Sequence, residues 1–163
     1  MARPIAVEDL SSSLPVKARL VGIDLGTKTI GLAISDVERR IASPLRTLRR
    51  GAFQKDADAL MAIFTEFEVA AVIVGLPLDL EGREGPRAQS TRAFARNLAG
   101  RTDLPIAYWD ERFSTAAVER ALIANDVSRA RRARVIDKMA AAYILQGALD
   151  RLAAITDKSG RHS

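Results

Sequence analysis

Three acidic residues stand at points of the sequence where a backbone element is expected to end or begin. Asp24 ends the first apolar run, Glu111 follows a later apolar run, and Asp137 opens the last expected helix. A carboxylate at the mouth of a buried strand is costly to keep unless something positive binds there. The positive partner that this arrangement favours is a divalent metal ion that faces a phosphate.

The composition permits carboxylate chemistry and excludes several other kinds. The chain has no cysteine, and its single histidine, His162, is the penultimate residue of a polar tail. A Ser-His-Asp triad, a Cys-His pair and a histidine-rich zinc site are therefore excluded. Mg²⁺ and Mn²⁺ prefer oxygen ligands, and two such ions about 4 Å apart can activate a water and stabilise the leaving oxygen in phosphodiester hydrolysis. Mg²⁺ or Mn²⁺ is the expected cofactor.

The acid that follows the later strand is ambiguous, because Asp110 and Glu111 are neighbours. Successive side chains of a strand point to opposite faces, so only one of the two can face the site, and the pattern does not say which. Each acid also has a structural alternative. Asp24 could accept backbone N–H groups in its turn, Asp110 or Glu111 could pair with Arg112, and Asp137 could complement a helix dipole.

The formal charge of +5 and a pI near 10.1 suggest a polyanionic partner. The basic residues form two groups, of which the first decorates a loop and a helix: Arg83, Arg87, Arg92, Arg96 and Arg101. The second group approaches Asp137: Arg129, Arg131, Arg132, Arg134 and Lys138. A solvated helix face explains the first group as well as phosphate binding does. The second is the better candidate for contact with a nucleic-acid backbone.

The elements that must position these residues follow from the spacing of apolar residues. Strands are expected at 20–24, 30–35, 41–48, 69–74 and 104–109. Helices are expected at 55–67, 87–98, from 114 or 115 through 122, and at 136–155. The first three strands form an antiparallel meander, and Pro44 marks the third as an edge or bulged strand. The order predicts an α/β fold with a mixed five-stranded sheet flanked by helices, but it does not fix the strand order.

A length of 163 residues suits one domain with a real core, expected at 18–155. Residues 1–17 lack the apolar stretch of a signal peptide and are expected to be a disordered leader, and 156–163 a polar tail. No run approaches the eighteen or so apolar residues that cross a bilayer, so no membrane segment is expected. The absence of cysteine fits a reducing compartment.

Four motifs, in order along the chain, resemble the YqgF/RuvX family. They are Gly-Ile-Asp-Leu-Gly-Thr-Lys at 22–28 with Ile-Gly-Leu-Ala at 30–33, Val-Gly-Leu-Pro at 74–77 with Glu-Gly-Pro-Arg-Ala-Gln at 84–89, Asp-Glu-Arg-Phe-Ser-Thr at 110–115, and Asp137 with 140–141 and 144–146. The motifs cover about 20–150. The resemblance implies a ribonuclease H-like fold and a cytoplasmic bacterial nuclease, for which Holliday junction resolution and maturation of the small-subunit ribosomal RNA precursor have both been suggested.

Carried over position by position, the family's acidic triad falls on Asp24, Glu111 and Asp137, and the resemblance selects Glu111 over Asp110. Catalytic and metal-binding roles are expected for these three acids. Nucleic-acid contacts are expected from Thr27, Lys28, Arg87, Arg112, Arg129, Arg131, Arg132, Arg134 and Lys138.

Two residues depart from the family pattern. Asp79 stands where asparagine is expected, and Thr29 stands where a basic residue is common. Either could reduce the affinity for a polyanion without touching the triad.

The expected function is that of a metal-dependent endo- or exonuclease on structured nucleic acid, acting at the 5′ end of the small-subunit ribosomal RNA precursor. One alternative is a Holliday junction resolvase on four-way DNA, which needs two sites and hence a dimer; a monomer and a homodimer both stay open. Another is a catalytically silent RNA-binding factor of ribosome assembly or transcription. A sugar-kinase, actin and Hsp70-like ATPase shares the turn at 24–27 but needs two such lobes.

Overall fold

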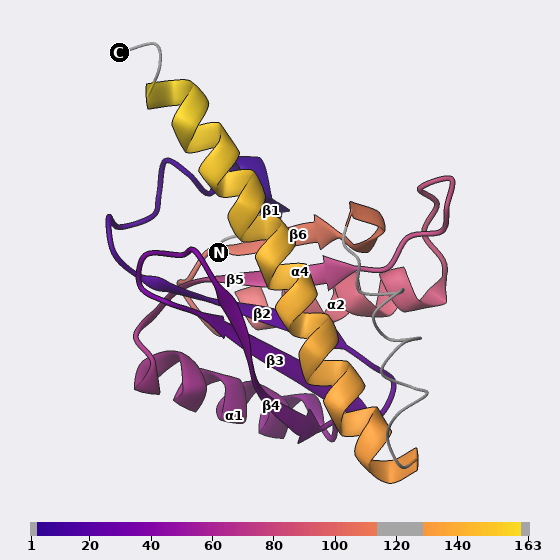
Figure 1. Ribbon diagram of the computed structural model, residues 1–163. Coiled ribbons are helices and arrows are strands. Elements are labelled where there is room, and N and C mark those ends of the chain that lie inside the picture. Colours follow the sequence, from indigo (N-terminus) through magenta and orange to yellow (C-terminus); the bar gives the residue numbers. More distant parts are fainter. Residues whose placement is uncertain (1–2, 114–128, 161–163) are drawn as a thin grey trace.

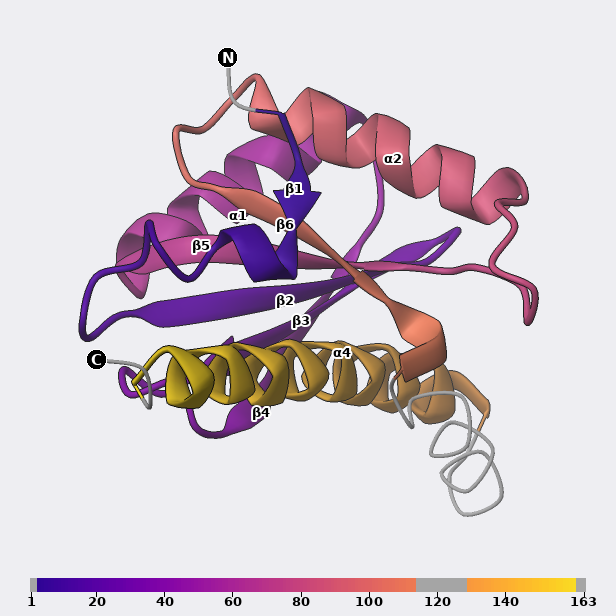
Figure 2. The same cartoon turned by 90° about the horizontal axis from the view of Figure 1, so that it is seen from above.

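The computed structural model describes residues 3–113 and 129–160, with side chains described for residues 3–113 and 138–156. Six strands form one mixed sheet, with α1 and α2 on one face and α4 on the other (Figures 1 and 2). The strands are β1 (Ile5–Ala6), β2 (Arg19–Leu25), β3 (Thr29–Ser35), β4 (Ala42–Arg49), β5 (Val69–Leu76) and β6 (Ile106–Asp110). The helices are α1 (Phe53–Glu66), α2 (Pro86–Ala99) and α4 (Arg129–Gly160), with the 3₁₀ turns η1 (Val7–Asp9) and η2 (Glu111–Phe113).

The strands lie in the order β1-β6-β5-β2-β3-β4. β2, β3 and β4 pair antiparallel, whereas β5 is parallel to both β2 and β6. The expected meander and the expected parallel strands are therefore present. β4 is an edge strand, and its pairing with β3 shifts register between Leu32 and Ala33, opposite Pro44, which has no N–H to donate to the ladder.

Strand alternation divides the core between the two faces of the sheet. Val21, Ile23 and Leu25 of β2 pack with the apolar residues of α1 and α2, and Leu20 packs with those of α4. β5 and most of β2 are buried at nearly every position. Both are therefore central strands with apolar residues on both faces, as the continuous apolar run at 69–74 predicted.

Glycines let α4 lie directly on the sheet, which it crosses diagonally (Figure 1). A Cβ on Gly22 would lie 2.7 Å from the Leu145 Cβ and 2.9 Å from the Ala141 carbonyl oxygen. A Cβ on Gly147 would lie 2.8 Å from Nε1 of Trp109. All three distances are shorter than a real Cβ atom tolerates, so the helix could not lie this close with larger residues at these positions.

The segment before β2 differs from the disordered leader expected at residues 1–17. β1 pairs in parallel with β6, with Ile5 opposite Ala107. Val7 and Leu10 are buried in the core that α4 covers, and Arg151 of α4 pairs with Glu8 at 3.3 Å. A few apolar residues spaced to fit that core are enough to order the segment.

α4 is longer than the helix expected at 136–155. It begins at Arg129, seven residues earlier, and continues to Gly160 within the expected polar tail. Arginine and alanine, which dominate residues 129–134, are both good helix formers. The helix expected from 114 or 115 through 122 falls outside the described residues. Within the described part of the chain, no helix has the length and apolar character that a membrane crossing requires.

Candidate active site

Asp24 is the next-to-last residue of β2 and is only 2% exposed. Because strand side chains alternate, Asp24 lies on the same face as Gly22, the face that α4 covers. Its cross-strand neighbour in β3 is Gly31. The carboxylate is thus held at the end of a central strand, beside a residue that has no side chain.

Glu111 lies on this same face. A Cβ on Gly75 of β5 would be 2.9 Å from Oε1 of Glu111 and 2.5 Å from Cδ1 of Ile144 in α4. The Glu111 carboxylate therefore lies over the bare backbone of Gly75. β5 lies between β6 and β2 in the sheet. Val74 of β5 pairs with Ile23 of β2, so the next residue of β5, Gly75, lies beside the next residue of β2, Asp24. The structure brings Asp24 and Glu111 to one face and one end of the sheet, with Gly75 between their strands.

Asp110 has a different environment, since it is bound by Arg112. Its carboxylate accepts hydrogen bonds from the backbone N of Arg112 at 3.0 Å and from Nη2 at 2.6 Å. Burial acts to raise the pKa of Asp110, but the interactions with Arg112 outweigh it, and the pKa lies below its ordinary value. The ion-pair alternative considered for this pair of acids therefore applies to Asp110. Arg112 also donates to the Leu80 carbonyl at 3.4 Å, so this predicted nucleic-acid contact is engaged within the protein.

The side chain of Asp137 lies outside the described side chains, but its backbone belongs to α4. Position 137 comes eight residues after Arg129, more than two turns into the helix. A helix dipole acts mainly within the first turn, so dipole complementation does not account for an acid at this position. The helix passes Gly22 at Ala141, one turn after position 137, and Gln146 then bonds the start of β4 at the other end of the sheet. α4 thus carries position 137 toward the end of the sheet that holds Asp24.

The described donors suit a hard cation, although they do not by themselves form a complete set of ligands. Among the side chains that the structure describes, no cluster of three acidic, histidine or cysteine groups could hold a metal, and the Asp137 side chain is not among them. Asp24 and Glu111 offer carboxylate oxygens, the ligand type that Mg²⁺ and Mn²⁺ prefer. The missing side chain of Gly75 leaves the space that the Glu111 carboxylate occupies. These residues fit the expected cofactor.

Several predicted nucleic-acid contacts gather at this end of the sheet. Thr27 and Lys28 form the β2–β3 turn. They line a hollow of about 670 Å³, called here the hairpin hollow, whose six lining residues are Thr27, Lys28, Thr29, Thr47, Arg49 and Arg50. Arg87, in the first turn of α2, donates to the Leu25 carbonyl at 3.4 Å and lines a smaller hollow of about 180 Å³ beside Thr27. The side chains of Arg129, Arg131, Arg132 and Arg134 lie outside the described side chains, and Lys138 is half-buried.

Arg49, Arg50 and Thr47 were missed in the sequence, where they belong to neither basic group. The signal that could have found them is the meander itself. In an antiparallel meander the end of the last strand lies beside the start of the middle strand. Arg49, at the end of β4, is indeed the cross-strand partner of Thr29, at the start of β3.

Comparison with known proteins places the chain in a family. Residues 18–151 match the family model described as "RuvX: Holliday junction resolvase". The chain belongs to the RuvX family. A protein of Beijerinckia indica subsp. indica named "Putative pre-16S rRNA nuclease" is 60% identical over 153 residues, which cover 94% of this chain and 93% of the relative. A protein of the same name from Methylocella silvestris is 58% identical over 154 residues, 94% of this chain and 96% of the relative.

A solved structure supports the ribonuclease H-like fold of this chain. Thermus thermophilus RuvC, in a complex with a Holliday junction substrate, superimposes with a TM-score of 0.53 at 14% identity, over 83% of this chain and 96% of RuvC. At this identity the likeness shows the fold alone. It confirms the ribonuclease H-like α/β architecture, and the short β1 adds a sixth strand to the five that were expected.

The two departures from the RuvX pattern have different surroundings. Asp79 accepts hydrogen bonds from the backbone N of Glu81 at 3.0 Å and of Arg83 at 2.8 Å, and it pairs with the Arg83 side chain at 3.0 Å. The backbone hydrogen bond from Arg83 is the main cause that lowers the pKa of Asp79. This carboxylate therefore organises the loop between β5 and α2. Thr29 begins β3 and lines the hairpin hollow.

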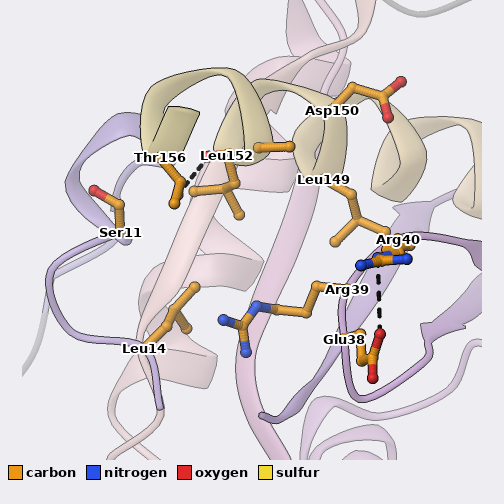
Figure 3. Close-up of a pocket in the computed structure, with 10 residues that line it drawn as sticks. Ser11, Leu14, Glu38, Arg39, Arg40, Leu149, Asp150, Leu152 and Thr156 are labelled. Carbon is orange, nitrogen blue, oxygen red and sulfur yellow. Dashed lines mark hydrogen bonds and ion pairs between the residues drawn. The ribbon is translucent and has the colours of Figure 1, made fainter. Parts of the chain in front are cut away.

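A third hollow, of about 370 Å³, lies away from these residues (Figure 3). Arg39 and Arg40 of the β3–β4 loop line it from one side, and Leu149 and Leu152 of α4 from the other. The β3–β4 loop and the β2–β3 turn lie at opposite ends of β3. This hollow is therefore at the end of the sheet remote from Asp24, and it includes none of the predicted site residues.

Proposed function

We propose that this chain is a metal-dependent nuclease that hydrolyses phosphodiester bonds in structured RNA, and that it acts at the 5′ end of the small-subunit ribosomal RNA precursor. The observation that carries the proposal is the position of Asp24 and Glu111 on one face and one end of the sheet, beside the bare backbone of Gly75. The name that two relatives bear, "Putative pre-16S rRNA nuclease", supports RNA as the substrate.

In this proposal Asp24, Glu111 and Asp137 hold Mg²⁺ or Mn²⁺, whose chemistry when bound is to polarise a phosphoryl oxygen and lower the pKa of a water. The protein's own part is positional. Burial of Asp24 restricts its side chain, and the missing side chain of Gly75 leaves room for the Glu111 carboxylate. The ion pair between Asp110 and Arg112 braces the η2 turn that carries Glu111.

The proposal assigns the RNA backbone to the cations around this end of the sheet. Thr27, Lys28 and Arg87 are assigned to the phosphodiester beside Asp24, because they lie at the same end of the sheet. Flanking phosphates are assigned to the four arginines in the first two turns of α4: Arg129, Arg131, Arg132 and Arg134. A helix dipole disfavours positive charge at the N-terminal turns, so such a cluster is more easily explained by a bound polyanion than by helix stability.

The test compares cleavage of a ribosomal RNA precursor fragment with cleavage of a four-way DNA junction, each with Mg²⁺ or Mn²⁺. We expect the RNA to be cut only when metal is supplied. Asp24→Asn should lower the rate by about 100-fold or more, as loss of one charged active-site group typically does. Asp103→Asn is the matched control, because Asp103 is exposed and precedes β6 at the opposite end of the sheet.

Other outcomes would decide between the alternatives. Cutting of the DNA junction alone would replace the proposal with a resolvase, which should then be a dimer with two sites. A folded, metal-supplied wild type that binds the RNA and cuts neither substrate would show a silent RNA-binding module. Equal losses in Asp24→Asn and Asp103→Asn would remove Asp24 from the site.

A further inference from the structure

The hairpin hollow has the chemistry of an anion site. Three of its six lining residues are cations, Lys28, Arg49 and Arg50, and the other three are threonines. Of these lining residues, all within the described part of the chain, none carries a carboxylate. Cations and hydroxyl groups are the side chains that contact phosphate and sugar in nucleic-acid complexes, where they fix the register of the strand without reading its sequence.

The register of the sheet connects this hollow with the candidate active site. Asp24 of β2 pairs with Gly31 of β3, and Gly31 pairs with Thr47 of β4. The three residues form a row across the face that α4 covers, and the middle one has no side chain. Two residues farther along, toward the β2–β3 turn and on the same face, Thr29 pairs with Arg49. Asp24 and Arg49 therefore lie on the same face and at the same end of the sheet.

Arg50 fixes the wall of the hollow. Its backbone N donates to the Lys28 carbonyl at 2.8 Å, and its Nη1 donates to the Gly26 carbonyl at 2.8 Å. The guanidinium also lies 5.9 Å from the ring centroid of Phe94 in α2. The β2–β3 turn, the end of β4 and α2 are therefore tied together before any ligand binds, and a preorganised site loses less entropy on binding.

We infer that the hairpin hollow binds a backbone phosphate of the nucleic-acid strand beyond the phosphate at Asp24, with Arg49 and Lys28 as the charged contacts and Thr29 and Thr47 as hydroxyl contacts. This inference rests on the proposed function, and it places the second phosphate at the β2–β3 turn and the end of the edge strand β4, at the same end of the sheet as Asp24. Recognition here is of the phosphate and is independent of the base.

The test measures binding rather than cleavage. In an Asp24→Asn background without added metal, the affinity for a labelled RNA hairpin is measured over a range of salt concentrations for three variants of the full chain. Arg49→Ala should weaken binding by about tenfold and reduce the slope of log K against log salt by about one. Arg49→Lys should keep the slope, since it keeps the charge. Arg46→Ala should leave affinity and slope unchanged.

Arg46 is a matched control, because it is an exposed arginine of the same strand and pairs with Leu32, whose side chain packs in the core under α1 and α2. Its side chain is therefore on the opposite face from Arg49. Thermal unfolding of each variant establishes that it is folded. A DNA hairpin of the same sequence, run in parallel, determines whether the bound phosphate belongs to RNA alone or to either nucleic acid.

Equal weakening by Arg49→Ala and Arg46→Ala would overturn the inference, because it would show a diffuse effect of net charge. Unchanged binding in Arg49→Ala would overturn it too. Failure of the proposed nuclease function can be told apart from failure of this inference. If only the nuclease function fails, wild type cuts neither substrate with metal, but Arg49→Ala still binds the RNA hairpin more weakly than Arg46→Ala in the metal-free assay.

Discussion

Asp110 and Glu111 are neighbouring carboxylates with opposite surroundings. Asp110 is neutralised by the guanidinium of Arg112, 2.6 Å away, whereas Glu111 begins a 3₁₀ turn and lies over Gly75 on the face of α4. Interchanging the two acids would not preserve the site, because the residue at 110 pairs with Arg112 and the residue at 111 lies over Gly75. The pair of residues therefore combines a brace with a candidate metal ligand.

The first residue-scale prediction concerns acid stability. Burial raises and the bonds from Arg112 lower the pKa of Asp110, with a net decrease. A carboxylate with a lowered folded pKa contributes stability that is full above its unfolded pKa, near 4, and is lost as the pH falls through the folded value. In urea unfolding from pH 6 to about pH 2.5, the difference in stability between wild type and Asp110→Asn should therefore shrink below about pH 4. A difference that stays constant with pH would contradict this assignment.

The second residue-scale prediction uses Gly75. In Gly75→Ala the new Cβ would meet the Glu111 carboxylate at 2.9 Å and must displace it. Metal-dependent cleavage should fall by about 10- to 100-fold, as for other disturbed supports of metal ligands, and Mn²⁺ binding measured by calorimetry should weaken. Gly85→Ala is the control, because nothing lies within 4 Å of its added Cβ.

Coupling gives a further check on Gly75. If the methyl acts through Glu111, Gly75→Ala should cost little extra activity once Glu111→Gln is present. Fully additive losses would show that the methyl disturbs the site by another route, such as the contact with Ile144.

At the scale of elements, the position of α4 depends on the surface of β2. The closest atoms to a Cβ on Gly22 are the Leu145 Cβ and the Ala141 carbonyl oxygen, which belong to the helix itself and cannot swing aside. Gly22→Ala should therefore push α4 from the sheet and lower the free energy of unfolding by about 1–3 kcal/mol. Urea denaturation measures the loss, and an unchanged midpoint would show that the helix can shift without cost.

Sequence reasoning predicted the elements whose signals are local. Ile30, Leu32 and Ile34 alternate along β3, and a continuous apolar run marks β5, so both strands could be found without knowledge of their neighbours. β1 could not, because it is two residues long and its pairing partner is remote in sequence. The start of α4 was misplaced, because arginines at 129–134 were interpreted as a polar approach rather than as helix formers.

The candidate site was predictable in its residue types and only partly in its geometry. The choice between Asp110 and Glu111 needed the family resemblance. The strand ends at Asp110 and a 3₁₀ turn begins at Glu111, so the alternation of side chains along β6 does not tell which face Glu111 occupies. The proposal for Arg49 needed the register of the meander, which shows that Arg49 pairs with Thr29. A bulge at Pro44 shifts the alternation along β4, so spacing alone does not tell which face its arginines occupy.

At the scale of the whole molecule, the two ends of the sheet have different character. The end with Asp24 carries the hairpin hollow and the start of α2, and the opposite end carries the hollow of Figure 3, where Glu38 and Arg40 pair at 3.7 Å. If nucleic acid binds as proposed, an RNA hairpin should slow hydrogen exchange in peptides that cover 26–29, 47–50 and 87–91. Peptides that cover 36–41 should exchange at unchanged rates.

The exchange experiment uses Asp24→Asn without metal, so that the RNA stays intact. The contrast between the two ends of the sheet is its internal control. Protection spread evenly over both ends would indicate general stabilisation rather than a bound strand, and protection of 36–41 alone would place the nucleic acid at the wrong end.

The parallel pairing of β1 with β6 also constrains the order in which the fold can assemble. Ile5 pairs with Ala107, about a hundred residues later in the chain. During synthesis on a ribosome the first residues emerge long before their partner strand, while the meander of β2, β3 and β4 has all its strands at hand much earlier. The N-terminal segment must therefore wait, and closing so long a loop is entropically costly. Its docking should be a late step in folding, completed only after β6 has been made.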